Sequence, residues 1–342
     1  MVMFLNHFRG AIAGAFVTQI GWTCLSLFFM LSGFLLTKLL VTEYRQNNSI
    51  SLVNYFIRRI LRIWPLYFLY MILIVVASFL LSGYPLDLSR LFGSLFFYDN
   101  VLTAASGKFN PNFATLHLWS ISLEEQYYLL LPFLVPWLLR MSKKKIILFF
   151  TVAFLLLFVA RFFISILHLN YAYAYVLPLS GDSFLVGVFL GLGIFETGIK
   201  KINPLFALVV GIVLLISLYF FPFRTVANNG WVMIATYFIP AVAFFFIFID
   251  VVYNEKGIIY KFLSNKILRY LGKISFGLYV FHMLANIITY HIFYLINEPL
   301  DIRSFLLALL ITIVLAVLSY ELIEKRFLKL KSRFTVIKSR EV

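Results

Sequence analysis

Nine apolar segments occupy most of this 342-residue chain, and each is long enough to cross a lipid bilayer. A helix needs about 20 apolar residues to span a hydrocarbon layer of roughly 30 Å. A helix also satisfies its backbone hydrogen bonds internally, which an open sheet in lipid cannot do. The sequence therefore predicts an all-α integral membrane protein, a bundle of nine full transmembrane helices. The predicted helices cover residues 21–39, 65–82, 118–139, 146–166, 175–195, 204–221, 231–249, 274–296 and 304–322.

The composition excludes the soluble protein classes. Charged residues make up 13% of the chain and hydrophobic residues 63%, whereas a soluble domain carries about 25% charged residues. Disordered chains, coiled coils and soluble enzymes do not fit these values, and the single cysteine, Cys24, excludes an internal disulfide framework. We divide the chain into one transmembrane domain, residues 1–330, and a short basic tail, residues 331–342.

The net charge of +15 orients the predicted bundle. When the nine segments cross in succession, 23 of the 29 Lys and Arg residues fall on one side, together with the C-terminus. Short loops rich in Lys and Arg stay in the cytoplasm, so that side is predicted to be cytoplasmic and no nucleic-acid partner is needed to explain the charge. Residues 1–8 are apolar but span less than half a bilayer. They are interpreted as the end of a partial tenth helix.

The polar block His117–Tyr128 opens the third predicted helix. On one continuous helix His117 and Glu124 share a face, while Glu125 points about 100° away. A histidine and a carboxylate on one face suit general acid–base chemistry. The alternative is that these groups lie at the water interface and only begin a helix.

Three arginines, Arg58, Arg59 and Arg62, precede Pro65, which is predicted to open a helix at its first position. Guanidinium groups bind phosphate oxygens well, so a nucleotide-carrying donor such as coenzyme A fits them. The alternative is that these arginines only orient the protein in the membrane and contact lipid phosphate. The residues alone favour this alternative.

Further polar residues lie within apolar segments, where charge is costly. Ser32 and Gly33 are interpreted as a packing notch. His282 is expected near mid-membrane, where a hydrogen bond to a neighbouring helix would explain it equally well. Asp182 must be paired or hydrated. His7, at the end of the partial helix, is unremarkable alone.

Taken in order, these motifs resemble the membrane-bound acyltransferase-3 family, which O-acylates sugars of bacterial surface polysaccharides and related acceptors. The resemblance covers nearly the whole chain. It rests on residues 2–8, Gly21 with residues 28–35, Arg58-Arg59-x-x-Arg62-x-x-Pro65-x-Tyr67, residues 117–128, residues 271–282, and Glu324-Lys325-x-Phe327.

The resemblance implies transfer of an acyl group, acetyl by preference, from cytoplasmic acyl-CoA to a sugar hydroxyl, in the bacterial inner membrane. His7 is the candidate base or transient acyl carrier, and Glu124 would orient it or the acceptor. No metal and no permanently bound cofactor are expected, and the oligomeric state stays open. The arginines that would hold the phosphates of acyl-CoA are Arg58 and Arg59, with Arg62 in support. The supporting residues are His117, Ser120, Glu125, Asp182 and His282.

One departure from the family pattern concerns an arginine eleven residues before the first-helix histidine. Counting back from His7 places it upstream of Met1. We therefore expect the native protein to begin some 10–20 residues earlier, since a span needs about 20. Two other classes remain open: a carrier or flippase for a lipid-linked sugar, and a catalytically inactive relative. A carrier usually shows inverted repeats and helices broken at mid-membrane, and neither is visible in the sequence.

Overall fold

The computed structural model describes residues 15–80, 87–108, 113–167, 180–218, 230–254 and 257–335, and throughout these ranges the regular structure is helical. Side chains are described in the same ranges, apart from residues 15–22, 113–114, 230 and 258. The predicted all-α class is thus confirmed for the described part of the chain. Candidate residue His7 lies outside it.

Six of the described helical segments are long and apolar enough to cross a membrane. Three further helices correspond to the other predicted spans: α6 (Trp119–Leu139), α8 (Asp182–Gly191) and α10 (Pro204–Ser217). The chain is therefore a multi-pass membrane protein. The six segments are α2 (Ala15–Asn47), α3 (Leu52–Leu80), α7 (Lys143–Ile166), α11 (Gly230–Tyr253), α14 (Ser275–Leu295), and α15 (Ile302–Ser319) with its continuation to Phe334.

Helix α3 begins at Leu52, so the predicted start at Pro65 is wrong and Pro65 lies inside the helix. Glu43 of α2 explains the early start, because its carboxylate accepts a hydrogen bond from the Ser51 N–H and pairs with Arg58 in the second turn. A proline inside a membrane helix is tolerated where its surroundings satisfy the freed backbone groups. The arginine cluster consequently lies on a helix rather than in a loop.

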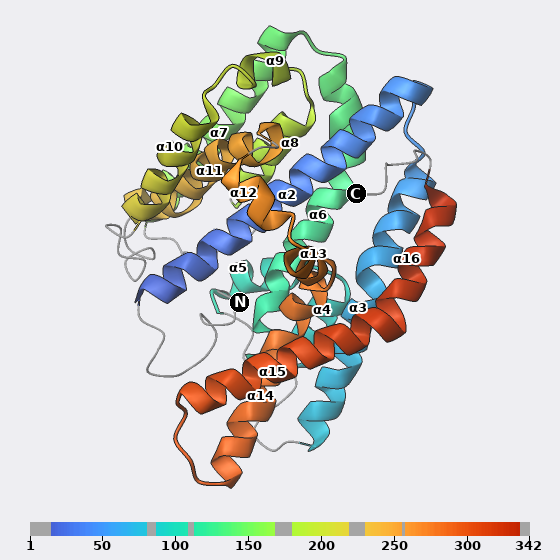
Figure 1. Cartoon of the computed structure of the whole chain (residues 1–342), viewed down its shortest axis with the longest axis vertical. Helices are drawn as coiled ribbons and strands as arrows, with labels where there is room; N and C mark the ends of the chain where they lie inside the picture. The colour runs from blue at the N-terminus through green and yellow to red at the C-terminus, as the bar shows by residue number, and fades with distance from the viewer. Residues whose placement is uncertain are drawn as a thin grey trace.

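Helices α2 and α8 touch along their backbones (Figure 1). A methyl group on Gly33 would come within 2.5 Å of the Phe184 carbonyl oxygen. Gly187 would meet the Met30 carbonyl oxygen in the same way. Small residues permit this close approach in membranes, and the predicted packing role of Gly33 is confirmed.

The last helices form one side of the bundle. Helices α14 and α15 pack as a hairpin, and α15 runs through the π-helical turn η5 (Tyr320–Glu324) into α16 (Lys325–Lys331), which lies beside α3 (Figure 1). Before α14 come the short helices α12 (Ile258–Leu263) and α13 (Lys266–Lys273). We call the end of the bundle formed by α13, α16 and the start of α3 the basic end, because arginines and lysines gather there.

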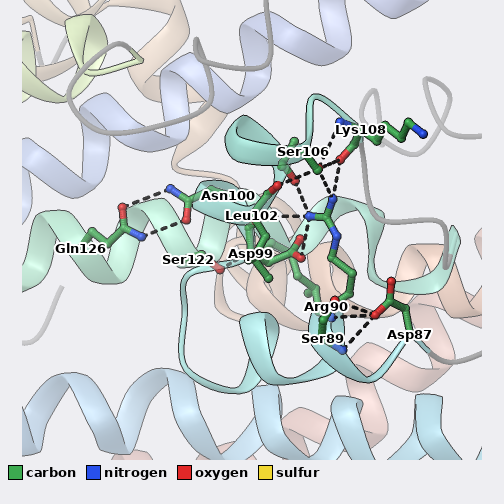
Figure 2. Close-up of polar contacts among 12 residues, drawn as sticks. Asp87, Ser89, Arg90, Asp99, Asn100, Leu102, Ser106, Lys108, Ser122 and Gln126 are labelled. Atoms are coloured by element: carbon green, nitrogen blue, oxygen red, sulfur yellow. Dashed lines mark hydrogen bonds and ion pairs between the residues drawn. The ribbon is translucent and has the colours of Figure 1, made fainter. Parts of the chain in front are cut away.

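A hairpin of α4 (Leu88–Leu95) and α5 (Asp99–Ser106) packs against the middle of α3, where the Tyr67 hydroxyl donates to the Ser94 carbonyl oxygen, and it is held by Arg90. The guanidinium donates to Asp99, Thr103, Ser106 and the backbone carbonyl of Lys108 (Figure 2).

The start of α4 and the attachment of the hairpin to α6 each depend on one polar residue pair. Asp87 caps α4, and the hydrogen bond from the Ser89 hydroxyl holds the pKa of the Asp87 carboxyl below its usual value. Asn100 and Gln126 exchange two hydrogen bonds, of 3.1 and 2.9 Å, which join the hairpin to α6 (Figure 2). Gln126 therefore serves the attachment of this hairpin.

One buried ion pair joins three helices. Arg161 of α7 donates both terminal nitrogens to the Asp182 carboxylate of α8, and both side chains are almost fully buried. The guanidinium also lies over the Tyr237 ring of α11, 4.5 Å from its centroid. Asp182 is thus paired, one of the two states expected for it.

Candidate active site

A buried polar cluster forms where α14 meets the short 3₁₀ helix η1 (Phe113–Leu118) and the start of α6. Its residues come from two distant parts of the sequence. The Tyr279 hydroxyl donates to the His117 carbonyl oxygen at 2.8 Å and makes a hydrogen bond with Ser120. The His117 and His282 rings meet edge to face, with centroids 4.8 Å apart. The structure thus brings together three of the predicted supporting residues, His117, Ser120 and His282.

Glu124 lies in a separate arrangement. His117 precedes α6 on η1, so the two residues do not share a face of one continuous helix. The Glu124 carboxylate is 2% exposed and accepts hydrogen bonds from the Ser32 hydroxyl, at 2.7 Å, and from the Tyr128 hydroxyl. Ser32, interpreted as part of a packing notch, instead orients the carboxylate. The half-buried Glu125 lies near Trp64 and Arg59.

The three arginines of α3 have different surroundings. Arg58 pairs with Glu43 at 3.0 Å and donates to the Phe334 carbonyl oxygen at 2.8 Å, which ties α2, α3 and the end of the described chain together. Arg59 is buried and lies over the Tyr128 ring, 5.9 Å from its centroid. Because Tyr128 also donates to Glu124, Arg59 and Glu124 contact the same side chain. Arg62 lines a cavity.

That cavity, which we call the basic cavity, has a volume of about 620 Å³ and opens at the basic end. Four cationic side chains and one carboxylate, Glu324, contribute to its wall. The Ser319 hydroxyl holds the Glu324 carboxylate at 3.0 Å. The cluster of cations around an open volume suits phosphate groups. The cations are Arg62, Lys266, Arg269 and Lys273.

A second cavity of about 490 Å³, the apolar cavity, lies between α2, α14 and α15. Its wall is mainly apolar and includes Cys24 and Phe28, together with Tyr279 and His282 of the polar cluster. The two cavities share three wall residues: Gly272, Ser275 and Phe276. A ligand with a phosphorylated head and a thin tail could therefore place its head among the cations and extend its tail to His282.

Several residues of this site were not singled out from the sequence. Lys266, Arg269 and Lys273 are regularly spaced on α13, but in the sequence they count as topological charge. Tyr279 belongs to the motif around His282, but nothing in the sequence indicates its contacts with His117 and Ser120. Ser32 and Tyr128 contact Glu124 across 92 residues and across one helical turn, respectively. Only the second of these spacings is visible in the sequence.

The chain belongs to a family of membrane acyltransferases: the family model described as "Acyltransferase domain", the acyltransferase-3 family, matches residues 1–321. The resemblance found from the motifs is therefore confirmed.

Among curated relatives, the O-acetyltransferase OatA of Staphylococcus aureus strain NCTC 8325 is 26% identical over 329 residues, which cover 89% of this chain and 52% of the relative. "Putative O-acetyltransferase SACOL0978" of strain COL is 26% identical over 327 residues, covering 90% of this chain and 53% of that protein. The chain thus spans about half the length of the curated relatives it matches. No solved structure matches it.

Proposed function

We propose that this protein transfers an acyl group, acetyl in the simplest case, from acyl-CoA to a sugar hydroxyl of a surface polysaccharide or lipid-linked glycan. Family membership and the O-acetyltransferase names of the relatives support O-acyl transfer. The observation that carries the donor assignment is the junction of the basic cavity with the apolar cavity, through Gly272, Ser275 and Phe276.

The donor would bind with its phosphates at the basic end. Guanidinium forks and ammonium groups hold phosphate oxygens by charge-assisted hydrogen bonds, and Arg62, Arg269 and Lys273 line the volume. The pantetheine arm would follow the apolar cavity and bring the thioester toward Tyr279 and His282. In this arrangement Arg62 contacts the donor directly. Arg58 and Arg59 support the first turns of α3, because Arg58 pairs with Glu43 and Arg59 lies over the Tyr128 ring.

The chemistry requires a base, because a neutral sugar hydroxyl is a weak nucleophile. The hydroxyl oxygen attacks the thioester carbonyl carbon while the base takes the hydroxyl proton. The C–S bond then breaks, and CoA leaves as the thiol after taking up a proton. An imidazole is suited to both proton steps near neutral pH. His7 remains our candidate base, or transient acyl carrier, and His117 and His282 would support the reacting groups.

For the topology, we propose nine full spans and a partial N-terminal helix, with the basic end in the cytoplasm of a bacterial inner membrane. Helices α8 and α10, with 10 and 14 residues, would then be short spans. Most residues of α8 are buried by its neighbours, whereas α10 packs on α11 and exposes most of its apolar side chains. The charge asymmetry of the loops supports this orientation. Acyl-CoA, a cytoplasmic metabolite, would meet the basic cavity from that side.

The test measures base-labile acetate on surface glycan from three strains: gene deleted, complemented with residues 1–342, and complemented with the His7→Ala variant. We expect the ester to disappear on deletion and to return only with the unmutated chain. If deletion leaves the ester of every glycan unchanged, the proposed function is wrong. Full ester with His7→Ala would remove His7 from the mechanism. Transfer of label from acetyl-CoA to glycan by the purified protein would identify a transferase, whereas a carrier would transfer no label.

A further inference from the structure

Helix α14 carries a stripe of polar residues along one face. Its members follow each other at intervals of four, three, four and three residues, the repeat that keeps side chains on one side of a helix. From the first to the last member, 14 residues, the stripe is about 21 Å long at 1.5 Å per residue. It therefore covers most of the roughly 30 Å thickness of a hydrocarbon layer. The stripe consists of Ser275, Tyr279, His282, Asn286 and Thr289.

The half of the stripe nearer the basic end belongs to the site already described. Ser275 lines both cavities, and Tyr279 and His282 contact the cluster around His117. The other half, Asn286 and Thr289, continues the same face away from the basic end. Nothing in the proposed donor site uses these two residues.

Asn286 and Thr289 are buried, at 6% and 0% exposure, and among the residues that the structure describes their side-chain polar atoms have no hydrogen-bond partner. A buried amide or hydroxyl without a partner destabilises the fold, because it gives up its hydrogen bonds to water and gains none in return. Polar residues that hold membrane helices together bond across the interface, and these two do not. Thr236 of α11 and Thr312 of α15 show the usual alternative, because each donates to the carbonyl four residues earlier at 2.7 Å.

The chemistry of the two side chains indicates what would satisfy them. An amide and a hydroxyl each offer both donors and acceptors, which is what a sugar hydroxyl requires. Residues 283–295 of α14 contain no Lys, Arg, Asp or Glu. This half of the stripe therefore favours a neutral polyhydroxy group over a phosphate. Its position beyond His282 is where an acceptor would stand if it met the acyl group from the side opposite the donor.

We propose that Asn286 and Thr289 form the acceptor subsite, in which they bind hydroxyl groups of the sugar that receives the acyl group. The inference rests on the proposed function for the identity of the reaction. It adds the residues that bind the acceptor and the direction from which it comes: donor and acceptor meet at His282 from opposite ends of one stripe.

The kinetic test uses the full chain in lipid nanodiscs, with labelled acetyl-CoA as donor and base-treated glycan from the deletion strain as acceptor. Thr289→Val removes one hydroxyl at nearly constant volume. We expect the KM for glycan to rise about tenfold, the worth of one hydrogen bond to a buried group, with the KM for acetyl-CoA unchanged. Thermal stability should be equal or higher, because the lost hydroxyl has no partner. The control Thr236→Val should leave both KM values unchanged. An unchanged KM for glycan in Thr289→Val and in Asn286→Leu would overturn the proposal.

A labelling test does not depend on turnover, so it separates failure of this subsite from failure of the proposed function. With Cys24→Ala as background, Thr289→Cys and Ile287→Cys place single thiols at similar depth on and off the stripe, since Ile287 is 3% exposed. A membrane-impermeant methanethiosulfonate, added from outside, should modify only the stripe thiol, and base-treated glycan should slow the reaction. Equal reactivity at both positions, no reactivity at Thr289→Cys, or no protection by glycan would each overturn the subsite, even if acetyl transfer is intact.

Discussion

The ion pair between Arg161 and Asp182 allows a quantitative prediction of how much one buried contact contributes to the free energy of unfolding. Both side chains are at most 3% exposed, and the guanidinium donates to each carboxylate oxygen. Asp182→Asn keeps the shape but leaves the Arg161 charge without its counter-ion. Removing one partner of a buried pair costs about 3–5 kcal/mol, because the remaining charge stays buried and uncompensated. The asparagine amide nitrogen cannot accept a hydrogen bond from Arg161, and the bond that its carbonyl oxygen still accepts is no longer charge-assisted on both sides.

Removing both charges should have a much smaller effect. The double variant Arg161→Met/Asp182→Leu replaces the pair with apolar groups of similar size, and such replacements are often neutral. The predicted pattern is therefore non-additive: the loss in the double variant stays well below the sum of the two single losses. The exposed pair of Lys200 and Glu196, 53% and 42% exposed, provides a control. Glu196→Gln should cost less than about 1 kcal/mol.

The assay is equilibrium unfolding of the purified chain by titration of SDS into mixed micelles, which gives the free energy of unfolding for each variant. A loss below about 1 kcal/mol for Asp182→Asn would refute the reasoning, because it would mean that water or another anion replaces the carboxylate. Additive losses in the double variant would also refute it. Activity measured on the same samples would show whether Asp182 has a role apart from stability.

Other predictions follow from single contacts. Gly33→Ala should destabilise the bundle by more than 1 kcal/mol, because its methyl group would meet the Phe184 carbonyl, whereas Gly198→Ala, with open space around it, should be neutral in the same SDS titration. Arg90→Lys cannot reproduce the fork of hydrogen bonds (Figure 2) and should speed proteolysis of the α4–α5 hairpin; Lys108→Ala should not, since only its backbone carbonyl accepts from Arg90. Arg269→Ala should raise the KM for acetyl-CoA about tenfold in low salt, and by less as the salt concentration rises. The control Lys143→Ala lies outside the cavity wall and should leave this KM unchanged. Equal effects of the two substitutions would exclude a phosphate contact at Arg269.

Much of the fold was predictable because long apolar segments in a membrane form helices, which satisfy their own backbone hydrogen bonds. Six of the nine predicted segments overlap described helices that are long and apolar enough to span a membrane, and the other three overlap α6, α8 and α10. The start of α3 was missed because Pro65 usually marks a helix beginning, whereas here Glu43, a residue of the preceding helix, stabilises the earlier start. Local rules cannot include such a contact.

The candidate site was predictable in its residue types and only partly in its pairing. His117, Ser120 and His282 stood out as polar groups in apolar surroundings, and the fold brings them together. The pairing of Glu124 with Ser32 depends on how α2 lies against α6, which no spacing in one sequence reveals. The stripe on α14 is different, since its four-and-three spacing can be seen in the sequence once Ser275 and Thr289 are included.

The π-helical turn at Tyr320–Glu324 sets the rotational phase between α15 and α16. A π turn holds one more residue than an α turn, so deleting a single residue there would restore α geometry and rotate everything beyond it by about 100°. That rotation would carry Glu324 away from the basic cavity and turn α16 off α3. The number of residues in this stretch is therefore as constrained as their chemistry. Natural length variation in this part of the protein should fall in the 296–301 connection between α14 and α15 rather than between α15 and α16.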